Sequence, residues 1–317
     1  MEKIQRALNK ARAARAAALL ALPGGAQPAP VAPAAAEPAV EKFQKALDKA
    51  RAARAAAVSA RPAEAPPAPA AAATAAEPNS AGLTISYRQT CVLPTSPRVL
   101  QRNRVVAASV DGLAADAFRI LRTQVLARLD ARQGRAVAIC AASKGNGKTL
   151  VAANLAVSLA RQLTRSAILV DLDLRNPSVH RCFGLRPESG LSDYLLGRKR
   201  LDECLINPGI ERLVLLPQPT RLQHSSELLT SPRMASLAQE LKGRYPDRVV
   251  IYDCPPLLLT NDPLLAMEYA DGCLLVVQEG KTSKRELLRA AELIGEHRYL
   301  GTVFNDARWS SVSTYYR

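Results

Sequence analysis

The chain has 317 residues, a length that suits two domains or one large domain with an appendage. Its formal net charge of +15 requires a polyanionic partner to be considered, while a count of only three histidines excludes a histidine-rich metal site. Six cysteines without a C-x-x-C pair favour reduced thiols over a disulfide-built secreted domain, and no apolar run approaches the ~18 residues of a membrane helix.

Residues 1–80 are an extension rich in alanine and proline, which cannot bury enough apolar surface to fold alone. Residues 1–18 recur at 40–57 with 14 of 18 positions identical, and each copy predicts a short, basic, amphipathic helix. One interpretation is a solvated helix without a partner. Duplication favours another, in which two equivalent helices dock together to a repeated partner or to a membrane surface.

The extension also carries much of the positive charge. Residues 1–61 contain 11 basic and four acidic side chains, so +7 of the +15 lies there. The high net charge therefore does not indicate a specific nucleic-acid-binding domain. We interpret residues 81–105 as a connecting segment, with short extended pieces at 83–87 and 91–93.

From residue 106 onward the pattern predicts an α/β domain that reaches residue 317. Continuous apolar runs predict buried parallel strands at 136–141, 168–172, 213–216, 249–252, 273–277 and 302–304. Helical patterns lie at about 112–130, 147–163, 232–242 and 284–296; the third follows Ser231-Pro232, and the fourth opens with a Ser283/Glu286 capping box. This alternation predicts a doubly wound, mostly parallel sheet with its ligand at the carboxyl ends of the strands.

A glycine-rich turn follows the strand predicted at 136–141. Residues 142–149, ASKGNGKT, fit the phosphate loop G-x-x-x-x-G-K-[ST] except that Ala142 replaces the first glycine. Gly145 and Gly147 let the backbone curl so that its N–H groups point at phosphate oxygens, and the helix N-terminus adds positive potential. Lys148 then reaches the β- and γ-phosphates, and the Thr149 hydroxyl binds Mg²⁺.

Carboxylates follow two further strands. Asp171 and Asp173 end the strand predicted at 168–172, and alternation along a strand would turn both toward one pocket. Because two unpaired carboxylates repel each other, a Mg²⁺ ion or a positive neighbour is expected between them. Asp253 ends the run VVIY, where a nucleotide hydrolase holds its Mg²⁺. Cys254 has no histidine nearby in sequence and is interpreted as a packing residue. Together these motifs predict a Mg-ATP site.

The order of GNGKT, the D-x-D-x-R motif at 171–175 and the YDCPP motif at 252–256 resembles that of the bacterial tyrosine kinases of capsule and exopolysaccharide export. These enzymes are relatives of the MinD/ParA ATPases and have a P-loop NTPase fold. Residues 116–122 also resemble that family's oligomerisation helix, and Asn305 matches the asparagine that contacts adenine. The resemblance covers residues 106–317.

The resemblance implies a role for each matching residue. Nucleotide binding would fall to Lys144, Gly145, Asn146, Gly147, Lys148, Thr149, Leu150 and Asn305. Thr149, Asp173 and Asp253 would organise Mg²⁺, while Asp171 would accept the proton of a tyrosine hydroxyl. Lys148, Asp171, Asp173 and Asp253 are thus the expected catalytic residues, with ATP and Mg²⁺ as the cofactors.

The resemblance also implies partners. Tyr315 and Tyr316 match the family's C-terminal acceptor tyrosines, and a ring formed through Asp116, Arg119 and Arg122 would bring them to a neighbouring subunit for autophosphorylation. A separate membrane polysaccharide co-polymerase would be the activator, with the duplicated helices as candidates for docking to it. The expected location is the cytoplasm, at the inner face of the cell membrane.

Two other functions remain open from the residues alone. The first is a MinD/ParA-like ATPase switch that phosphorylates nothing, although the strict lysine of those ATPases would fall at Ser143, one position before Lys144. The second is a scaffold whose nucleotide site is only structural.

Overall fold

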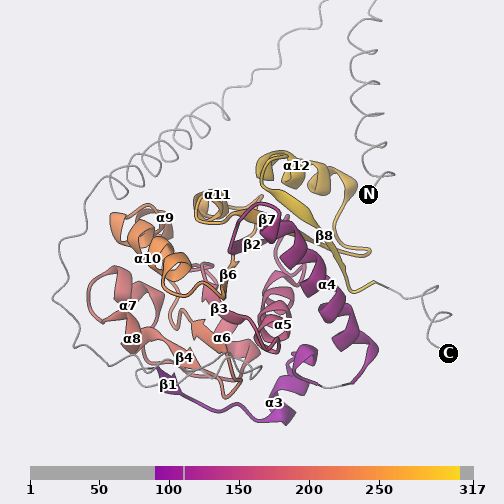
Figure 1. Ribbon diagram of the computed structural model, residues 1–317. Helices are drawn as coiled ribbons and strands as arrows, with labels where there is room; N and C mark the ends of the chain where they lie inside the picture. The colour runs from indigo at the N-terminus through magenta and orange to yellow at the C-terminus, as the bar shows by residue number, and fades with distance from the viewer. Residues whose placement is uncertain (1–89, 110, 308–317) are drawn as a thin grey trace, which may run out of the picture. The chain divides into compact units, whose positions relative to one another are not determined.

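The structure is a computed structural model, and it describes residues 90–109 and 111–307. An eight-stranded sheet runs through these residues with strand order β1-β4-β5-β3-β6-β2-β7-β8 (Figure 1). Every neighbouring pair is parallel except β4 and β5. The predicted α/β class with a mostly parallel sheet is confirmed.

Strands β2, β3 and β6 lie at the centre of the sheet and are buried along their whole length, as their continuous apolar sequences predict. The strands are β1 (Cys91–Val92), β2 (Ala136–Ala141), β3 (Ser166–Asp171), β4 (Ile206–Asn207), β5 (Leu213–Leu216), β6 (Arg248–Asp253), β7 (Gly272–Gln278) and β8 (Tyr299–Asn305). Strand β8 begins at Tyr299 rather than at 302, because a register shift opposite Cys273 and Leu274 interrupts the pattern there.

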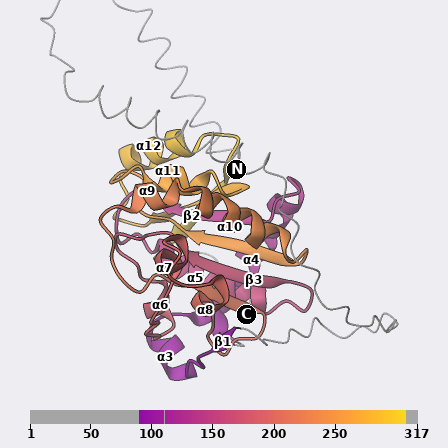
Figure 2. The ribbon, with the colours of Figure 1, turned by 90° about the vertical axis from the view of Figure 1, so that its left-hand side faces the viewer.

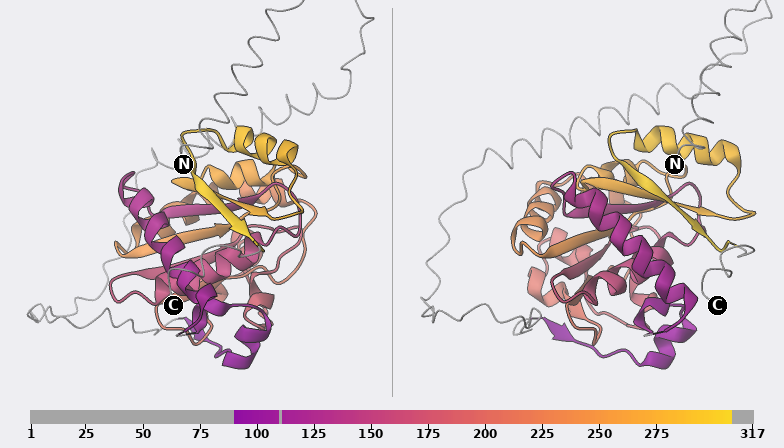
Figure 3. Two further views of the ribbon diagram at one scale, coloured as in Figure 1. Left: turned by 90° about the vertical axis from the view of Figure 1, so that its right-hand side faces the viewer. Right: turned by 45° about the vertical axis from the view of Figure 1, so that its right-hand side comes forward.

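Helices cover both faces of the sheet, as a doubly wound fold requires (Figures 2 and 3). They are α3 (Pro97–Arg102), α4 (Leu113–Asp130), α5 (Lys148–Ala160), α6 (Val179–Cys182), α7 (Leu191–Leu195), α8 (Leu201–Cys204), α9 (Ser225–Leu229), α10 (Pro232–Gly243), α11 (Asp262–Met267) and α12 (Lys284–Ile294), with a 3-10 helix at Val106–Ala108. Side chains of α4 and α5 form one hydrophobic core, and those of α10, α11 and α12 contribute to a second core on the other face.

The predicted caps explain where two of these helices begin. Ser231 accepts a hydrogen bond from the N–H of Met234, and Pro232 occupies the first turn of α10. Ser283 and Glu286 form the predicted capping box of α12. The four long helices were predicted, whereas the four- to six-residue helices α3, α6 to α9 and α11 were not, since so few residues show no periodicity.

Residues 90–109 contact the rest of the domain through several polar bonds. Strand β1 pairs with β4, and the amide of Asn154 in α5 donates to the carbonyl of Arg104 while its oxygen accepts from the N–H of Ala107. The pieces expected at 83–87, the duplicated helices and Tyr315 and Tyr316 lie outside the described residues. Among the helices in the described ranges, none combines the length and apolar character needed to cross a bilayer.

Candidate nucleotide-binding and phosphoryl-transfer site

The loop between β2 and α5 lies at the carboxyl end of the central strands. Gly145 and Gly147 have φ angles of +81° and +89°, which side-chain-bearing residues rarely adopt. A Cβ at Gly147 would also displace the amide group of the Asn305 side chain, which lies against this glycine. Helix α5 begins directly at Lys148, and its first N–H groups are therefore available to an anion.

Lys148 connects the two acidic motifs. Its buried Nζ lies 2.8 Å from Oδ2 of Asp173 and 3.9 Å from Oδ1 of Asp253. Burial lowers the pKa of Lys148, but the negative charges of Asp253 and Asp173 outweigh burial and raise that pKa above its ordinary value. Lys148 is thus the positive neighbour that the paired carboxylates were expected to have.

Asp253, at the end of β6, is fully buried next to Thr149. The Thr149 hydroxyl donates to its Oδ2 at 2.6 Å, while its Oδ1 accepts no hydrogen bond from any described residue. Burial raises the pKa of Asp253 to about 6, against the opposing charge of Lys148. The Thr149 hydroxyl and the Asp253 carboxylate, with its unsatisfied buried Oδ1, fit Mg²⁺, which prefers oxygen ligands.

The acidic side chains do not form a metal cage of their own. Within residues 90–109 and 111–307, no three His, Cys, Asp or Glu side chains are arranged to hold a metal ion. Mg²⁺ characteristically takes one or two carboxylates together with substrate phosphates and water. The donor set of Thr149, Asp173 and Asp253 therefore fits a magnesium ion that arrives with a nucleotide.

Asp171 lies at the end of β3 and is fully buried. Its Oδ2 accepts from the N–H groups of Ser178 and Val179 at 2.9 and 3.0 Å. Burial and the charge of Asp253 raise the pKa of Asp171 to about 7, although the two backbone hydrogen bonds act in the opposite direction. The two backbone hydrogen bonds hold the carboxylate in one position, and its pKa lies near neutrality. Both properties suit a group that accepts a proton.

Asp173 is not on the strand, contrary to our interpretation of the D-x-D spacing. Strand β3 ends at Asp171, so the alternation of a strand does not place Asp173. Its Oδ1 accepts from the N–H of Asn176 and its Oδ2 contacts Lys148, and turn geometry therefore brings it to the site.

A second polar cluster, which the sequence analysis did not identify, connects the loop after β3 to α9 and α11. The Arg175 Nε lies 2.9 Å from both the Ser225 hydroxyl and Oδ2 of Asp262, and the Ser226 hydroxyl donates to Oδ1 of Asp262. Asp262 is buried, yet in sequence it looks like an ordinary acidic residue in the first turn of a helix. We call Arg175, Ser225, Ser226 and Asp262 the Asp262 cluster.

Residues of β8 and of the turn before α12 hold the outer side of the phosphate loop. Asn305 Nδ2 donates to the carbonyl of Asn146 at 3.0 Å, and the Asn146 amide donates to the Thr282 hydroxyl. Ser143 likewise donates to Glu286, the capping residue of α12. The structure therefore brings Asn305 to the loop, together with contacts that no sequence motif had indicated.

The three residues expected to form an oligomer interface make contacts in two separate places within the chain. Asp116 pairs with Arg119 one turn away on the exposed side of α4. Arg122 points elsewhere and donates to the carbonyl of Ser158 in α5 at 2.8 Å. Leu113 and Ile120 are large apolar residues that α4 leaves exposed.

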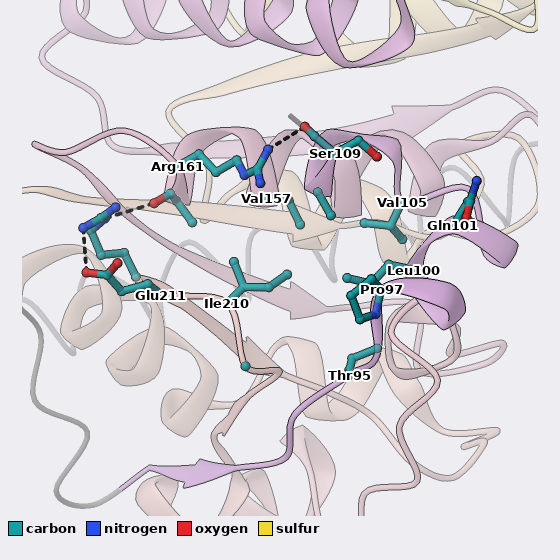
Figure 4. A pocket seen from close by; sticks show the side chains of 14 residues that line it. Thr95, Pro97, Leu100, Gln101, Val105, Ser109, Val157, Arg161, Ile210 and Glu211 are labelled. Carbon is teal, nitrogen blue, oxygen red and sulfur yellow. Dashed lines mark hydrogen bonds and ion pairs between the residues drawn. The ribbon is translucent and has the colours of Figure 1, made fainter. Parts of the chain in front are cut away.

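The structure has a cavity beside the segment around α3. It has a volume of about 570 Å³ and opens between that segment, the end of α5 and residues 209–212, and Figure 4 shows Ile210 and Val157 lining it. All six cysteines are free, as predicted, and Cys254 is fully buried in the core beside Cys140 and Cys273.

Comparisons with known proteins agree with this geometry. A family described as an AAA domain matches residues 134–297. Tyrosine-protein kinase YwqD of Bacillus subtilis (strain 168) is 34% identical over 219 residues, which cover 68% of this chain and 91% of that protein. Succinoglycan biosynthesis transport protein ExoP of Rhizobium meliloti (strain 1021) is 30% identical over 67% of this chain, which spans 27% of ExoP.

A solved structure gives the same result. The crystal structure of the chimerical protein CapA2B2 is 27% identical with a TM-score of 0.59, and the match covers 68% of this chain and 92% of that one. The fold and the phosphate loop define a P-loop nucleotide-binding domain. The chain belongs to the family of AAA domains that includes the bacterial tyrosine-protein kinases. The resemblance predicted from the motifs and the predicted class of enzyme are confirmed.

Proposed function

We propose that the chain binds Mg-ATP at the phosphate loop and transfers the γ-phosphoryl group to tyrosines, including Tyr315 and Tyr316 of a second copy. The observation that carries this proposal is the convergence of Lys148, Thr149, Asp173 and Asp253 at the carboxyl ends of β2, β3 and β6. Phosphoryl transfer depends chiefly on positioning and charge stabilisation, which such a group supplies.

The nucleotide-binding roles follow from the loop. The N–H groups of residues 144–150 hold phosphate oxygens, and Lys148 turns from Asp173 toward the β- and γ-phosphates. Thr149, Asp173 and Asp253 would hold the magnesium ion, which would neutralise charge on the phosphates. Asn305 reaches the adenine base from the end of β8, where its bond to Asn146 supports that position.

Asp171 is the proton acceptor in this proposal. The tyrosine O–H gives its proton to the Asp171 carboxylate as the phenolic oxygen bonds to phosphorus, and the bond between phosphorus and the bridging oxygen of ADP breaks. A pKa near 7 leaves a substantial fraction of Asp171 ionised at neutral pH, as a general base requires.

The cellular role we infer is control of exopolysaccharide assembly or export. The printed name of ExoP, a succinoglycan biosynthesis transport protein, supports this link. A separate membrane co-polymerase would activate the kinase at the inner face of the membrane, and a ring formed through Asp116, Arg119 and Arg122 would present each tail to its neighbour. The exposed Leu113 and Ile120 on the same helix support such an interface.

The test is a phosphosite map. Purified full-length protein is incubated with labelled ATP and Mg²⁺, alone and with a membrane co-polymerase, and phosphotyrosine is located by mass spectrometry. Label on Tyr315 or Tyr316 that is lost in Lys148→Met supports the proposal, and a Lys284→Met variant is the matched control. ADP release without label would instead support the ATPase switch, and nucleotide binding without either product would support the scaffold.

A further inference from the structure

Helix α3 and the segment around α6 form one continuous surface. The amide of Asn103 donates to the carbonyls of Arg181 and Cys182 at 2.9 and 3.2 Å. On the other side of α3, the Thr95 hydroxyl donates to the carbonyl of Phe183 at 2.8 Å. These bonds place residues that are about 80 positions apart in sequence side by side.

This surface is strongly basic. Residues 93–109 and 174–187 contain six arginines and no aspartate or glutamate. All six are exposed, and five of them form no ion pair with an acidic residue in the described ranges; the five are Arg98, Arg102, Arg104, Arg181 and Arg186. We call these five the α3–α6 arginines. The sixth, Arg175, belongs to the Asp262 cluster.

The charge of the domain is concentrated in these two segments. Residues 90–307 have a formal net charge of +7, and the two segments contribute +6 of it. The remaining residues of this range therefore carry almost balanced charges. Such a concentration of positive charge indicates a binding surface for a negatively charged partner. Binding to that partner would weaken as the salt concentration rises.

Apolar side chains continue the same edge of the molecule. Val92 and Leu93 are 48% and 37% exposed, and they precede α3 by only a few residues. Figure 1 shows β1 and α3 at one edge of the domain, with α12 at the opposite edge. Exposed aliphatic groups beside arginines are typical of a surface that lies on a lipid bilayer, since the aliphatic groups enter the interface while the arginines meet phosphates.

The chain itself supplies a second argument for a membrane. Residues 1–61, which precede β1 in sequence by about 30 residues, add +7 to the chain. A planar guanidinium group also binds phosphate oxygens in pairs, which suits lipid headgroups. We infer that the α3–α6 arginines, with Val92 and Leu93, dock the kinase domain on an anionic phospholipid surface. This inference does not depend on kinase activity.

The test is vesicle co-sedimentation of the full-length chain. Vesicles of phosphatidylcholine are compared with vesicles that also contain phosphatidylglycerol, at low and high salt. Each arginine near an anionic surface contributes about fivefold to partitioning. The combined variant Arg98→Gln, Arg102→Gln, Arg186→Gln is therefore expected to bind the anionic vesicles about 100-fold more weakly.

A matched control removes the same number of charges elsewhere. Lys284→Gln, Arg285→Gln, Arg289→Gln lies on α12, at the opposite edge, and is expected to change binding by less than about threefold. A second variant, Val92→Ser with Leu93→Ser, is expected to lose about tenfold through its apolar contacts. Circular dichroism and ATP binding, which none of these changes should alter, confirm that the variants fold.

Three results would overturn the inference. The first is equal vesicle binding by the triple α3–α6 variant and the parent chain. The second is an equal loss in the α12 control, which would mean that only net charge matters. The third is a loss of binding to a short RNA duplex in the α3–α6 variant with vesicle binding unchanged, which would assign the surface to nucleic acid.

Discussion

The phosphate-loop region and the exposed side of α4 both bring acidic and basic side chains together, but in opposite ways. Lys148 meets Asp173 and Asp253, which lie 25 and 105 positions further along the chain, and all three are buried. Asp116 meets Arg119 one turn away, in solvent. Burial strengthens the electrostatic interaction of Lys148 with the two aspartates and shifts the pKa values of Lys148 and Asp253. Solvent screens the interaction between Asp116 and Arg119. The first arrangement can support chemistry alone; the second requires a partner.

The largest expected effect breaks the buried arrangement. Lys148→Met leaves Asp173 and Asp253 buried without their cation, and we expect it to lower the free energy of unfolding by about 3 to 5 kcal/mol at pH 8. At pH 5.5 the loss should be smaller, because Asp253, with a pKa raised to about 6, becomes protonated. Denaturant unfolding at both pH values checks this, and a loss that is independent of pH would contradict it.

A smaller effect is expected at the Asp262 cluster. Asp262→Asn weakens the partly buried bond to Arg175 and should cost about 2 kcal/mol of stability. We also expect about tenfold slower autophosphorylation with little change in ATP affinity, since the cluster orients the loop after β3 without touching the phosphate loop. Glu292→Gln, which removes an exposed pair with Arg289, is the matched control. Weaker ATP binding with an unchanged rate would contradict this assignment.

The pH dependence of stability sharpens the comparison further. Asp171 has its pKa raised to about 7 in the folded chain against an ordinary value of 3.8, so its ionisation opposes folding above pH 4. Without Mg²⁺, the free energy of unfolding should fall by about 1 to 2 kcal/mol more between pH 6 and pH 8 in the parent chain than in Asp171→Asn. Parallel stability curves for the two proteins would show that Asp171 does not titrate in this range.

The smallest effect concerns α4. Asp116→Ala removes an exposed pair and should change the stability of a single chain by less than about 0.5 kcal/mol. If α4 mediates the assembly of subunits into a ring, the same change should nevertheless shift the oligomer distribution in analytical ultracentrifugation. Thr123→Ala on the same helix is the control. A large loss of monomer stability would contradict the contrast between the two regions.

The sequence predicts the sheet, the long helices and the phosphate loop because each depends on local pattern. Continuous apolar runs identify β2 and β6. A glycine-rich turn between a strand and a helix, followed by lysine and threonine, is typical of a phosphate-binding loop. The Asp262 cluster could not be found in this way, since Arg175 and Asp262 meet only through the tertiary fold. Asp173 was placed at the site for the wrong reason, because a turn, and not a strand, directs it there.

The hydrogen bond between Asn305 and Asn146 has a consequence for folding during synthesis of the chain. Synthesis proceeds from the N-terminus, and residue 146 leaves the ribosome long before residue 305 does. A nascent chain therefore possesses the glycine-rich curl but not the strand that braces it. Any product that stops before β8 is expected to lack a finished nucleotide pocket, so translation errors of this kind should yield inert fragments rather than unregulated kinases.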